Sequence, residues 1–201
     1  MSRTNNLARA DFSGSTAQVA ERLLGKLLLS QSPDGLTIGR VVETEAYLPN
    51  ADPACHAAKH RTARTEIMFD QPGMAYVYPI HSRVCFNVVT EKEGLGAAVL
   101  IRAIEPIAGV ELMQQRRGIS NIRLLASGPS RLCQALAITR RVNGKDLTLG
   151  APVWFADDGY RYRSDEISNT VRIGVTSAQQ LKLRFVIRNS PFASGPAALR
   201  R

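Results

Sequence analysis

The sequence predicts an α+β domain built around a mainly antiparallel sheet. Segments rich in Leu, Ile and Val are separated by short turns, and helical segments fall between them without the regular strand–helix–strand alternation of a parallel sheet. The length of 201 residues suits one domain, and we find no internal repeat or boundary that divides it. Residues 1–201 are therefore expected to form a single domain with flexible ends at 1–14 and 195–201.

The first segment predicts a helix followed by a hairpin. A helix is expected over Thr16–Leu24, where Ser15 provides the N-terminal cap and a glycine follows the last residue. Two apolar strands are expected over Lys26–Gln31 and Leu36–Tyr47. The Ser-Pro-Asp-Gly sequence at Ser32–Gly35 between them is typical of a tight turn.

A polar loop and a second pair of strands come next. Two prolines within Leu48–Arg64 favour a loop, and a short helix is expected over Ala63–Phe69 with Thr62 as its cap. A Pro-Gly turn then precedes strands expected over Met74–Tyr78 and Val84–Thr90.

The second half of the chain completes the sheet and adds two helices. A strand is expected over Ala97–Ile104 and should end before Pro106, which lacks an amide for the ladder. Helices are expected over Gly109–Arg116 and over Pro129–Ile138, where proline is tolerated in the first turn. The region from Val153 to Ile187 reads as further strands between Gly and Asp turns.

Charge and cysteine content narrow the class of function. Lys and Arg number 26 and Asp and Glu 17, so the net charge is +9 and the pI is about 10.0, which favours a polyanionic partner such as nucleic acid. The three cysteines show no CxxC pairing, which is typical of a reducing compartment. No secretory signal or membrane span is apparent, so we expect a cytoplasmic protein without a membrane partner.

The strand over 36–47 carries two carboxylates on one face. Because side chains alternate along a strand, Glu43, Glu45 and Tyr47 should point the same way, while Val42 and Thr44 point inward. Two acids and an aromatic ring near a strand end could form a site. Judged on the strand alone, an ordinary solvated face is the better interpretation, because paired exposed acids are common.

Basic side chains accumulate after this strand. Each by itself suits a solvated surface, but together they could follow a phosphate backbone. Tyr47, Tyr76 and Tyr78 interleave with them, and aromatic faces are needed to hold a base that has left its stack. The candidate backbone contacts are Arg61, Arg64, Arg83, Arg131, Arg140, Arg141 and Lys145.

No cofactor motif is found. Cys55, His56 and His60 could suggest zinc, but His81 and Cys85 do not form the second close pair that a structural zinc site needs, so no metal is expected. No GxGxxG, Walker A or GxSxG sequence is present, so we expect no cofactor at all.

Taken together, seven segments resemble the alkyladenine (3-methyladenine) DNA glycosylase family. They occur in the family order, and they cover the chain from about Leu23 to Ser194. The matching segments are Gly39-Arg-Val-Val-Glu-Thr-Glu-Ala-Tyr47, Pro72-Gly-Met-Ala-Tyr-Val-Tyr78, Asn87, Val99-Leu-Ile-Arg-Ala-Ile-Glu-Pro106, Ser127-Gly-Pro-Ser-Arg-Leu-Cys-Gln-Ala-Leu-Ala-Ile138, Arg172-Ile-Gly-Val175 and Arg184-Phe-Val-Ile-Arg-Asn-Ser-Pro191.

The resemblance implies a monofunctional purine DNA glycosylase that acts in base excision repair. Such an enzyme flips an alkylated or deaminated purine out of double-stranded DNA and cleaves its N-glycosidic bond with water, leaving an abasic site. It uses no metal and no Schiff-base lysine. The resemblance also implies a curved sheet with surrounding helices and a protruding hairpin that inserts into DNA. Our default expectation for the oligomeric state is a monomer.

The resemblance also assigns roles to particular residues. Glu45 matches the general base and Arg102 the arginine beside the catalytic water, and a nearby guanidinium would favour the ionised form of Glu45. Glu43 is left as a supporting or solvated residue. The residues that match the pocket around the flipped base are Tyr47, His56, Tyr78 and Asn87, the last being the one that discriminates against guanine.

Each assignment has an ordinary structural alternative. Tyr47 and Tyr78 could be core aromatics, and His56 could be a loop histidine bonded to backbone. Asn87 could close a strand end. Arg102 could pair with Glu105 or Glu111.

One segment departs from the family pattern. The family places a Tyr-Gly-Met sequence between the pocket tyrosine and the asparagine, and this tyrosine wedges into the DNA. Here the segment reads Tyr78-Pro-Ile-His-Ser-Arg-Val-Cys-Phe-Asn87 and is one residue shorter. Counting from Tyr78 makes His81 the wedge, which is our hypothesis, whereas counting from Asn87 leaves Ile80, His81 and Ser82 open. Because the wedge segment differs, a second function stays open, namely that of a non-catalytic protein with the same fold that binds damaged DNA.

Overall fold

In the computed structural model, which describes residues 4–58, 60–196 and 198, the long third strand organises the whole sheet. β3 (Gly35–Tyr47) pairs with β2 (Leu27–Ser32) along its first half and with β6 (Ala98–Ala108) along most of its length. Its second half also pairs with β9 (Arg184–Ile187) at residues 43–45. Strand β3 is therefore covered by neighbours on both edges where Glu43 and Glu45 lie.

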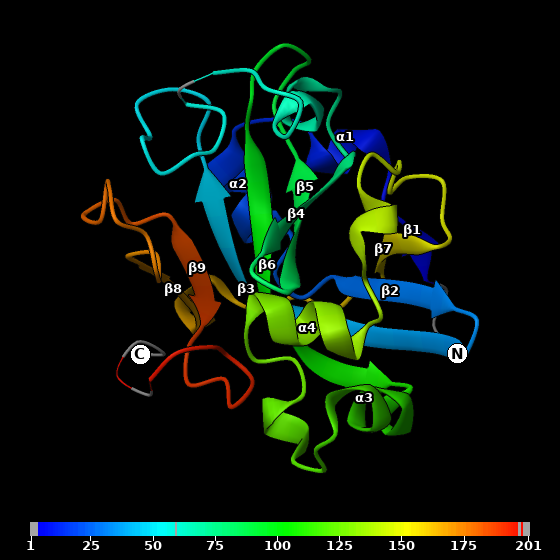
Figure 1. The fold of residues 1–201 in the computed structure, drawn as a ribbon. Coiled ribbons are helices and arrows are strands. Elements are labelled where there is room, and N and C mark those ends of the chain that lie inside the picture. The colour runs from blue at the N-terminus through cyan, green and yellow to red at the C-terminus, as the bar shows by residue number, and fades with distance from the viewer. Residues whose placement is uncertain (1–3, 59, 197, 199–201) are drawn as a thin grey trace.

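Within the described residues, nine strands form one antiparallel sheet in the order β1-β7-β2-β3-β6-β5-β4, with β8 joined through β9. Figure 1 shows that β3 and β6 run through its centre and that the sheet is strongly curved. The remaining strands are β1 (Asn5–Asn6), β4 (Ala75–Ile80), β5 (Arg83–Val89), β7 (Val153–Asp157) and β8 (Ile167–Thr170).

Helices cover both faces of the central strands. Helix α2 (Thr16–Arg22) packs against β3 and β6 from one side, and α4 (Pro129–Ala135) packs against β5 and β6 from the other (Figure 1). The Ser15 hydroxyl accepts from the Gln18 amide and begins α2, as predicted. The other helices are α1 (Arg9–Phe12) and α3 (Val110–Arg117), with 3-10 turns at Glu66–Phe69, Ile122–Leu124, Arg140–Val142 and Ser164–Glu166.

This arrangement confirms the predicted single α+β domain with a curved antiparallel sheet. Apolar side chains from both helices and from the strands between them form the main core, including Phe12, Leu23, Phe86, Ile101 and Phe155, each fully buried. No helix among the described residues is both long enough and apolar enough to cross a bilayer.

Two expected element boundaries were wrong. The helix expected over Ala63–Phe69 is only a 3-10 turn at Glu66–Phe69, because residues 62–65 form a turn in which the Thr62 hydroxyl accepts from the Thr65 amide. Strand β6 continues through Pro106 to Ala108. Pro106 lies opposite Gly39, where the register is irregular, and such an irregularity tolerates a residue without an amide hydrogen.

The N-terminal segment contacts the sheet. Residues 5–6 pair with β7, and Phe12 on α1 is fully buried against Phe155 at 5.7 Å between ring centroids. The flexible ends expected at 1–14 and 195–201 stay a prediction. Of the end at 195–201, positions 197 and 199–201 lie outside the described residues.

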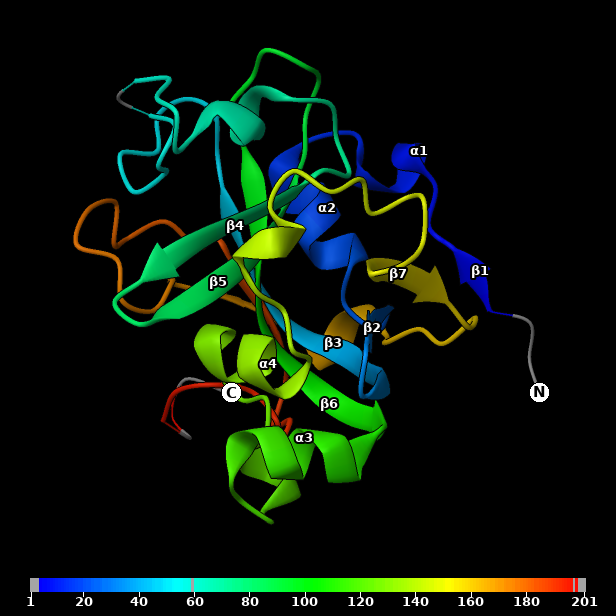
Figure 2. The same ribbon diagram turned by 45° about the vertical axis from the view of Figure 1, so that its right-hand side comes forward.

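The strands β4 and β5 form a hairpin with a two-residue connection, His81 and Ser82. Ile80 pairs with Arg83 immediately before the turn, and His81 adopts a left-handed backbone with φ of 50°. Strand β4 is an edge of the sheet. The tip of this hairpin lies at the periphery of the molecule, close to the loop that precedes β9 (Figure 2).

Candidate active site

A cavity of about 330 Å³ opens between the β4–β5 hairpin, the loop after β3 and the loop that precedes β9. Alternate residues of β4, Tyr76, Tyr78 and Ile80, face it because they share one side of the strand. The other lining residues are Tyr47, Pro53, Ala54, His56, Arg64, Met68, Asn87, Ala98, Gly174, Val175, Thr176 and Ser177. The walls are thus mostly aromatic or apolar, with a few polar groups among them.

Aromatic rings define the shape of the cavity. The His56 ring stands nearly perpendicular to Tyr78 with centroids 4.5 Å apart, and its Nδ1 lies 3.0 Å from the Tyr76 hydroxyl. Tyr76 and Tyr78 are 5.5 Å apart. Burial raises the pKa of Tyr78 above its ordinary value, so its hydroxyl stays protonated at neutral pH. A planar heterocycle would meet aromatic faces here, as a flipped base requires.

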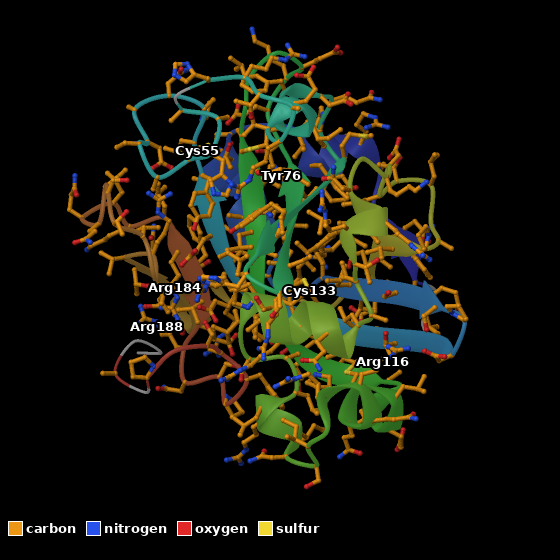
Figure 3. All side chains as sticks on the ribbon, viewed as in Figure 1. Cys55, Tyr76, Arg116, Cys133, Arg184 and Arg188 are labelled. Atoms are coloured by element: carbon orange, nitrogen blue, oxygen red, sulfur yellow. The ribbon has the colours of Figure 1, made fainter. Side chains whose placement is uncertain are left out.

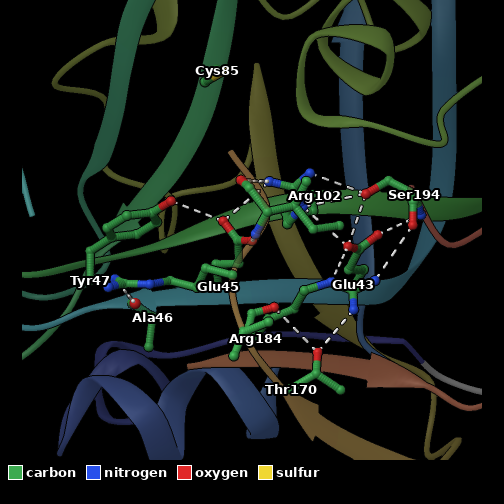
Figure 4. A network of polar contacts seen from close by, with 12 residues as sticks. Glu43, Glu45, Ala46, Tyr47, Cys85, Arg102, Thr170, Arg184 and Ser194 are labelled. Carbon is green, nitrogen blue, oxygen red and sulfur yellow. Dashed lines mark hydrogen bonds and ion pairs between the residues drawn. The ribbon is translucent and has the colours of Figure 1, made fainter. Parts of the chain in front are cut away.

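Glu45 lies behind the Tyr47 wall of the cavity and is fully buried. One carboxylate oxygen, Oε2, accepts from the Tyr47 hydroxyl at 2.9 Å and from Arg102 Nη1 at 3.2 Å. The other, Oε1, accepts from the Ile173 amide at 2.7 Å. Burial, followed by the charge of Glu45, raises the pKa of Tyr47, which therefore remains a donor. Figure 4 shows these contacts converging on the carboxylate.

Arg102, on the neighbouring strand β6, joins the two carboxylates of β3. Its Nε donates to Glu43 at 3.1 Å while Nη1 donates to Glu45. Burial opposes its charge, but the negative charges of Glu45 and Glu43 prevail and raise its pKa. The contacts described for Arg102 are to these two acids, to Ser194 and to the Ile173 carbonyl, so the alternative pairing with Glu105 or Glu111 was wrong.

Glu43 is fully buried, so the interpretation of a solvated strand face was wrong. It accepts from Arg184 Nε at 2.6 Å, from the Ser194 amide at 2.6 Å and from the Ser194 hydroxyl at 2.9 Å. The register of β3 against β6 shifts on either side of Glu43. Glu43 shares Arg102 with Glu45, and the face on which both were expected to meet water is buried at this point, where β9 pairs with β3.

A second buried ion pair, Arg172 with Asp52, packs against the Tyr47 ring where this ring lines the cavity. Arg172 donates to both Asp52 oxygens at 2.7 Å, and both side chains are fully buried. The Arg172 guanidinium lies 4.7 Å from the centre of the Tyr47 ring and donates to the Ala46 carbonyl at 3.0 Å. Sequence reasoning placed Arg172 in a matching segment without a role and missed Asp52, because no spacing or periodicity marks an acid in a proline-rich loop.

Asn87 lies within β5 opposite Tyr76 and Leu100, so it does not close a strand end. It is buried, it lines the cavity, and its side-chain amide donates to the Tyr76 carbonyl at 3.0 Å. His81 is exposed at the tip of the hairpin, whereas Ile80, 43% exposed, is the residue of the turn region that lines the cavity.

Four of the predicted basic residues gather around the hairpin. Arg64 lines the cavity and lies 5.3 Å from the centre of the Tyr78 ring. Arg64 and Arg140 also line a hollow of about 410 Å³ beside Tyr78 and Pro79. Arg83, Arg140 and Arg141 line a hollow of about 740 Å³ on the α4 side of the hairpin. These side chains thus border adjoining depressions that lead away from the aromatic cavity.

The other three predicted basic residues are placed differently. Arg61 makes a two-pronged pair with Glu66. Arg131 on α4 donates to the Ser127 carbonyl, and Lys145 is exposed in the loop that follows Arg140–Val142. Their contact with DNA stays a prediction.

Cys55 and His56 contact neighbouring protein groups. Burial raises the pKa of the Cys55 thiol to about 11, and this thiol donates to the Gly96 carbonyl. His56 is bonded to Tyr76, as described above. Among the described residues, no group of three or more His, Cys, Asp or Glu side chains is arranged to hold a metal ion.

The site combines a buried carboxylate, which accepts hydrogen bonds from a guanidinium and an amide, with an aromatic cavity directly in front of it. Basic side chains border this cavity. The arrangement is a candidate acid–base site for a planar ring that belongs to a polyanion. A family model for methylpurine-DNA glycosylase matches residues 10–191. The chain belongs to the methylpurine-DNA glycosylase family.

Bacterial and archaeal relatives agree with this assignment. A protein of Mesorhizobium japonicum is 42% identical over 194 residues, which cover 96% of this chain and 92% of the relative. One of Koribacter versatilis is 44% identical, covering 94% and 93% of the two chains. One of Methanocella arvoryzae is 46% identical, covering 94% and 95%. All three carry the provisional name 3-methyladenine DNA glycosylase.

Proposed function

We propose that this protein is a monofunctional DNA glycosylase of base excision repair that removes alkylated or deaminated purines from double-stranded DNA. The observation that carries the proposal is Glu45, a buried carboxylate with three hydrogen-bond donors on it, set behind the wall of an aromatic cavity. Membership of the methylpurine-DNA glycosylase family supplies the substrate class.

The chemistry follows from the position of Glu45. A water molecule attacks C1′ of the flipped nucleotide, the bond from C1′ to the base nitrogen breaks, and Glu45 accepts the water proton. The sugar passes through a state with oxocarbenium character, which the carboxylate also stabilises. A cationic alkylated purine leaves as the neutral base, whereas a neutral purine such as hypoxanthine leaves as an anion that takes up a proton. Glu45 returns the water proton to solvent, and the DNA keeps an abasic site. General base catalysis is worth about 10²–10⁴-fold, and positioning by the cavity contributes the rest.

The cavity walls suit the flipped base. Tyr47, Tyr78 and His56 offer aromatic faces, and Asn87 presents a carboxamide that would oppose the exocyclic amine of guanine. The raised pKa of Tyr78 and the lowered pKa of His56, which follows from burial and from the nearby Arg64, leave both side chains uncharged at neutral pH. These two side chains therefore place no charge of their own against a neutral or a cationic purine.

DNA would lie along the arginines that border the hairpin. Arg64, Arg140, Arg83 and Arg141 line adjoining hollows, and the chain carries a net charge of +9. A basic track of this kind binds phosphates without reading sequence. We propose that the protein acts as a monomer, without a cofactor.

The hairpin tip would fill the space that the flipped base leaves. His81 is our candidate for this wedge because it is exposed at the turn, with Ile80 beside it at the cavity. A stopped-flow assay with a fluorescent lesion should show faster return of the base into the duplex for His81→Ala than for the wild type. The same rates in His81→Ala, combined with a change in Ile80→Ala, would assign the wedge to Ile80.

The decisive test of the proposed function uses a duplex that carries hypoxanthine or 1,N6-ethenoadenine. Incubation with the wild type followed by alkali should break the strand at the lesion, whereas Glu45→Gln should not. Glu21→Gln, an exposed acid on α2, serves as the matched control and should behave as the wild type. If the wild type bound these duplexes but broke none of several lesions, the protein would be a damage-binding protein. Equal breakage by wild type and Glu45→Gln would exclude Glu45 as the base.

A further inference from the structure

The network around Glu45 contains two carboxylates and two guanidinium groups in alternating order. Arg184 donates to Glu43 at 2.6 Å, Glu43 accepts from Arg102 at 3.1 Å, and Arg102 donates to Glu45 at 3.2 Å. All four side chains are at least nine-tenths buried. Figure 4 shows the chain of contacts running from β9 through β3 and β6 back to β3. The formal charges of the four groups cancel.

Arg102 is shared between the two acids, so its effect on Glu45 depends on Glu43. Arg184 Nε and the Ser194 amide each donate to Glu43 at 2.6 Å, and the Ser194 hydroxyl donates to the same acid at 2.9 Å. Charges this close interact strongly because the surroundings are dry. A change of charge at Glu43 or Arg184 must therefore be felt at Glu45, although neither residue is among those that line the cavity.

We propose that Glu43 and Arg184 are positioning residues that form a counter-charge pair, which holds Arg102 in place and sets how much of its charge acts on Glu45. This inference rests on the proposed role of Glu45 as general base. Arg184 binds Glu43 from one side, Glu43 holds Arg102 through Nε, and Arg102 then presents Nη1 to Glu45. Glu43 would thus take up part of the positive charge of Arg102 and keep its Nη1 aligned on Glu45.

Other charged or titratable groups also face Glu45 and must be kept constant in a test. Tyr47 precedes the loop after β3, Tyr78 and Cys85 belong to the hairpin, and Arg172 with Asp52 lies beyond Tyr47. None of them connects Arg184 to Glu45 through the contacts described above. Substitutions at Glu43 and Arg184 thus change the counter-charge while these groups remain.

The proposal predicts opposite effects of two substitutions on the pH dependence of the chemical step. Glu43→Gln removes a negative charge, so Glu45 stays ionised to lower pH and the acidic limb of the rate profile should move down by about one pH unit. Arg184→Gln removes a positive charge and should move the limb up by about one unit. The double variant restores neutrality and should return the limb close to its wild-type position.

The measurement is the single-turnover rate of hypoxanthine excision with saturating enzyme between pH 5 and 8, because this lesion stays neutral there. Arg188→Gln is the matched control, since Arg188 follows the same strand but is exposed (Figure 3). Arg184→Lys keeps the charge and should keep the limb in place. It also preserves a test if Glu43→Gln fails to fold, which circular dichroism would show, because the Lys and Gln variants of Arg184 can then be compared alone.

The outcomes separate this inference from the proposed function. Excision by Glu45→Gln at the wild-type rate would exclude Glu45 as the base and would overturn both. If Glu45→Gln is inactive but Glu43→Gln and Arg184→Gln lower the rate without moving the limb, or move it in the same direction, the counter-charge pair is wrong and the proposed function stands. Opposite shifts with DNA affinity unchanged within a few-fold would establish the pair.

Discussion

Two arginine–carboxylate pairs of nearly equal geometry differ in their exposure to solvent. Arg172 and Asp52 are joined at 2.7 Å, and both side chains are fully buried. Arg61 and Glu66 are joined at 2.6 Å, but their side chains are 56% and 53% exposed. The two distances are nearly the same, whereas the surroundings are not.

This difference in exposure shows that ion pairs in the interior and ion pairs at the exposed surface around the site contribute differently to stability. Water stabilises each partner of an exposed pair when the pair breaks, so such a pair contributes about 0–1 kcal/mol. A buried pair is costly to assemble and costlier to break, because the remaining charge stays in a dry site. Buried pairs such as Arg172–Asp52 therefore hold the position of the Tyr47 ring, whereas an exposed pair such as Arg61–Glu66 can open at little cost.

The largest effect should come from breaking the buried pair. Asp52→Asn leaves the Arg172 guanidinium buried beside a neutral amide, and we expect the free energy of unfolding to fall by about 3–5 kcal/mol. Glu66→Gln, the matched change at an exposed pair, should leave the free energy of unfolding nearly unchanged. Urea unfolding followed by circular dichroism measures both. A loss at Asp52 as small as that at Glu66 would contradict the contrast between the two regions.

The next largest effect is expected from the hydrogen bond that the Tyr47 hydroxyl donates to Glu45. Tyr47→Phe keeps the ring at the cavity but removes the hydroxyl that donates to Glu45 at 2.9 Å. A hydrogen bond to a charged group contributes about 1.5–3 kcal/mol, so the single-turnover rate should fall by at least about tenfold while affinity for lesion DNA is kept. Tyr160→Phe, at an exposed tyrosine, is the control. An unchanged rate would show that the hydroxyl does not support Glu45.

At the rim the expected effect is on binding rather than on chemistry. Arg140→Gln and Arg141→Gln should each weaken binding to any duplex and lower the salt dependence of log K by about 0.9 for each phosphate that is no longer neutralised. The excision rate at saturating protein should stay the same. Arg163→Gln, at an exposed residue near β8 that pairs with Asp165, is the control. Titrations by fluorescence anisotropy at several salt concentrations would decide, and an unaltered slope would place the DNA track elsewhere.

The order of elements was predictable from local signals. Ser15 at the start of α2 and the Ser-Pro-Asp-Gly turn depend on residues close in the chain, and the structure confirms the helix and the first hairpin. Pro106 was misjudged because its partner across the sheet, Gly39, allows an irregular register, and partners cannot be read from a local pattern.

The site was predictable only where residues of one segment suffice or where the family resemblance applies. Glu45, Tyr47 and Arg102 do come together, as that resemblance implied. The alternation of side chains along the strand did not distinguish Glu43 from Glu45, and both were expected at the surface. In the structure, β9 and Ser194 bury Glu43, although they lie more than 130 residues away in the sequence. Asp52 and Arg184 acquire their importance from long-range pairing, which composition and spacing do not encode.

The smallest expected effect is on the pH dependence of the free energy of unfolding, and it involves His56, which lies between the buried interior and the exposed arginines. Its Nδ1 contacts the Tyr76 hydroxyl, and burial together with the Arg64 guanidinium lowers its pKa below the ordinary value of about 6.5. A histidine of lowered pKa binds fewer protons in the folded than in the unfolded protein. Its contribution to stability is therefore complete above about pH 6.5 and is lost as pH falls through the lower folded value.

The free energy of unfolding of the wild type should thus decrease between pH 7 and pH 5.5 more than that of His56→Gln. The exposed His60 gives the control His60→Gln, which should follow the wild type. Arg64→Gln should also flatten the curve, because it removes the rim charge that opposes protonation of His56. Urea titrations at each pH test this. If the wild type and His56→Gln lose stability in parallel, the protonation of His56 does not contribute to the pH dependence, and the effect assigned to the Arg64 charge is wrong.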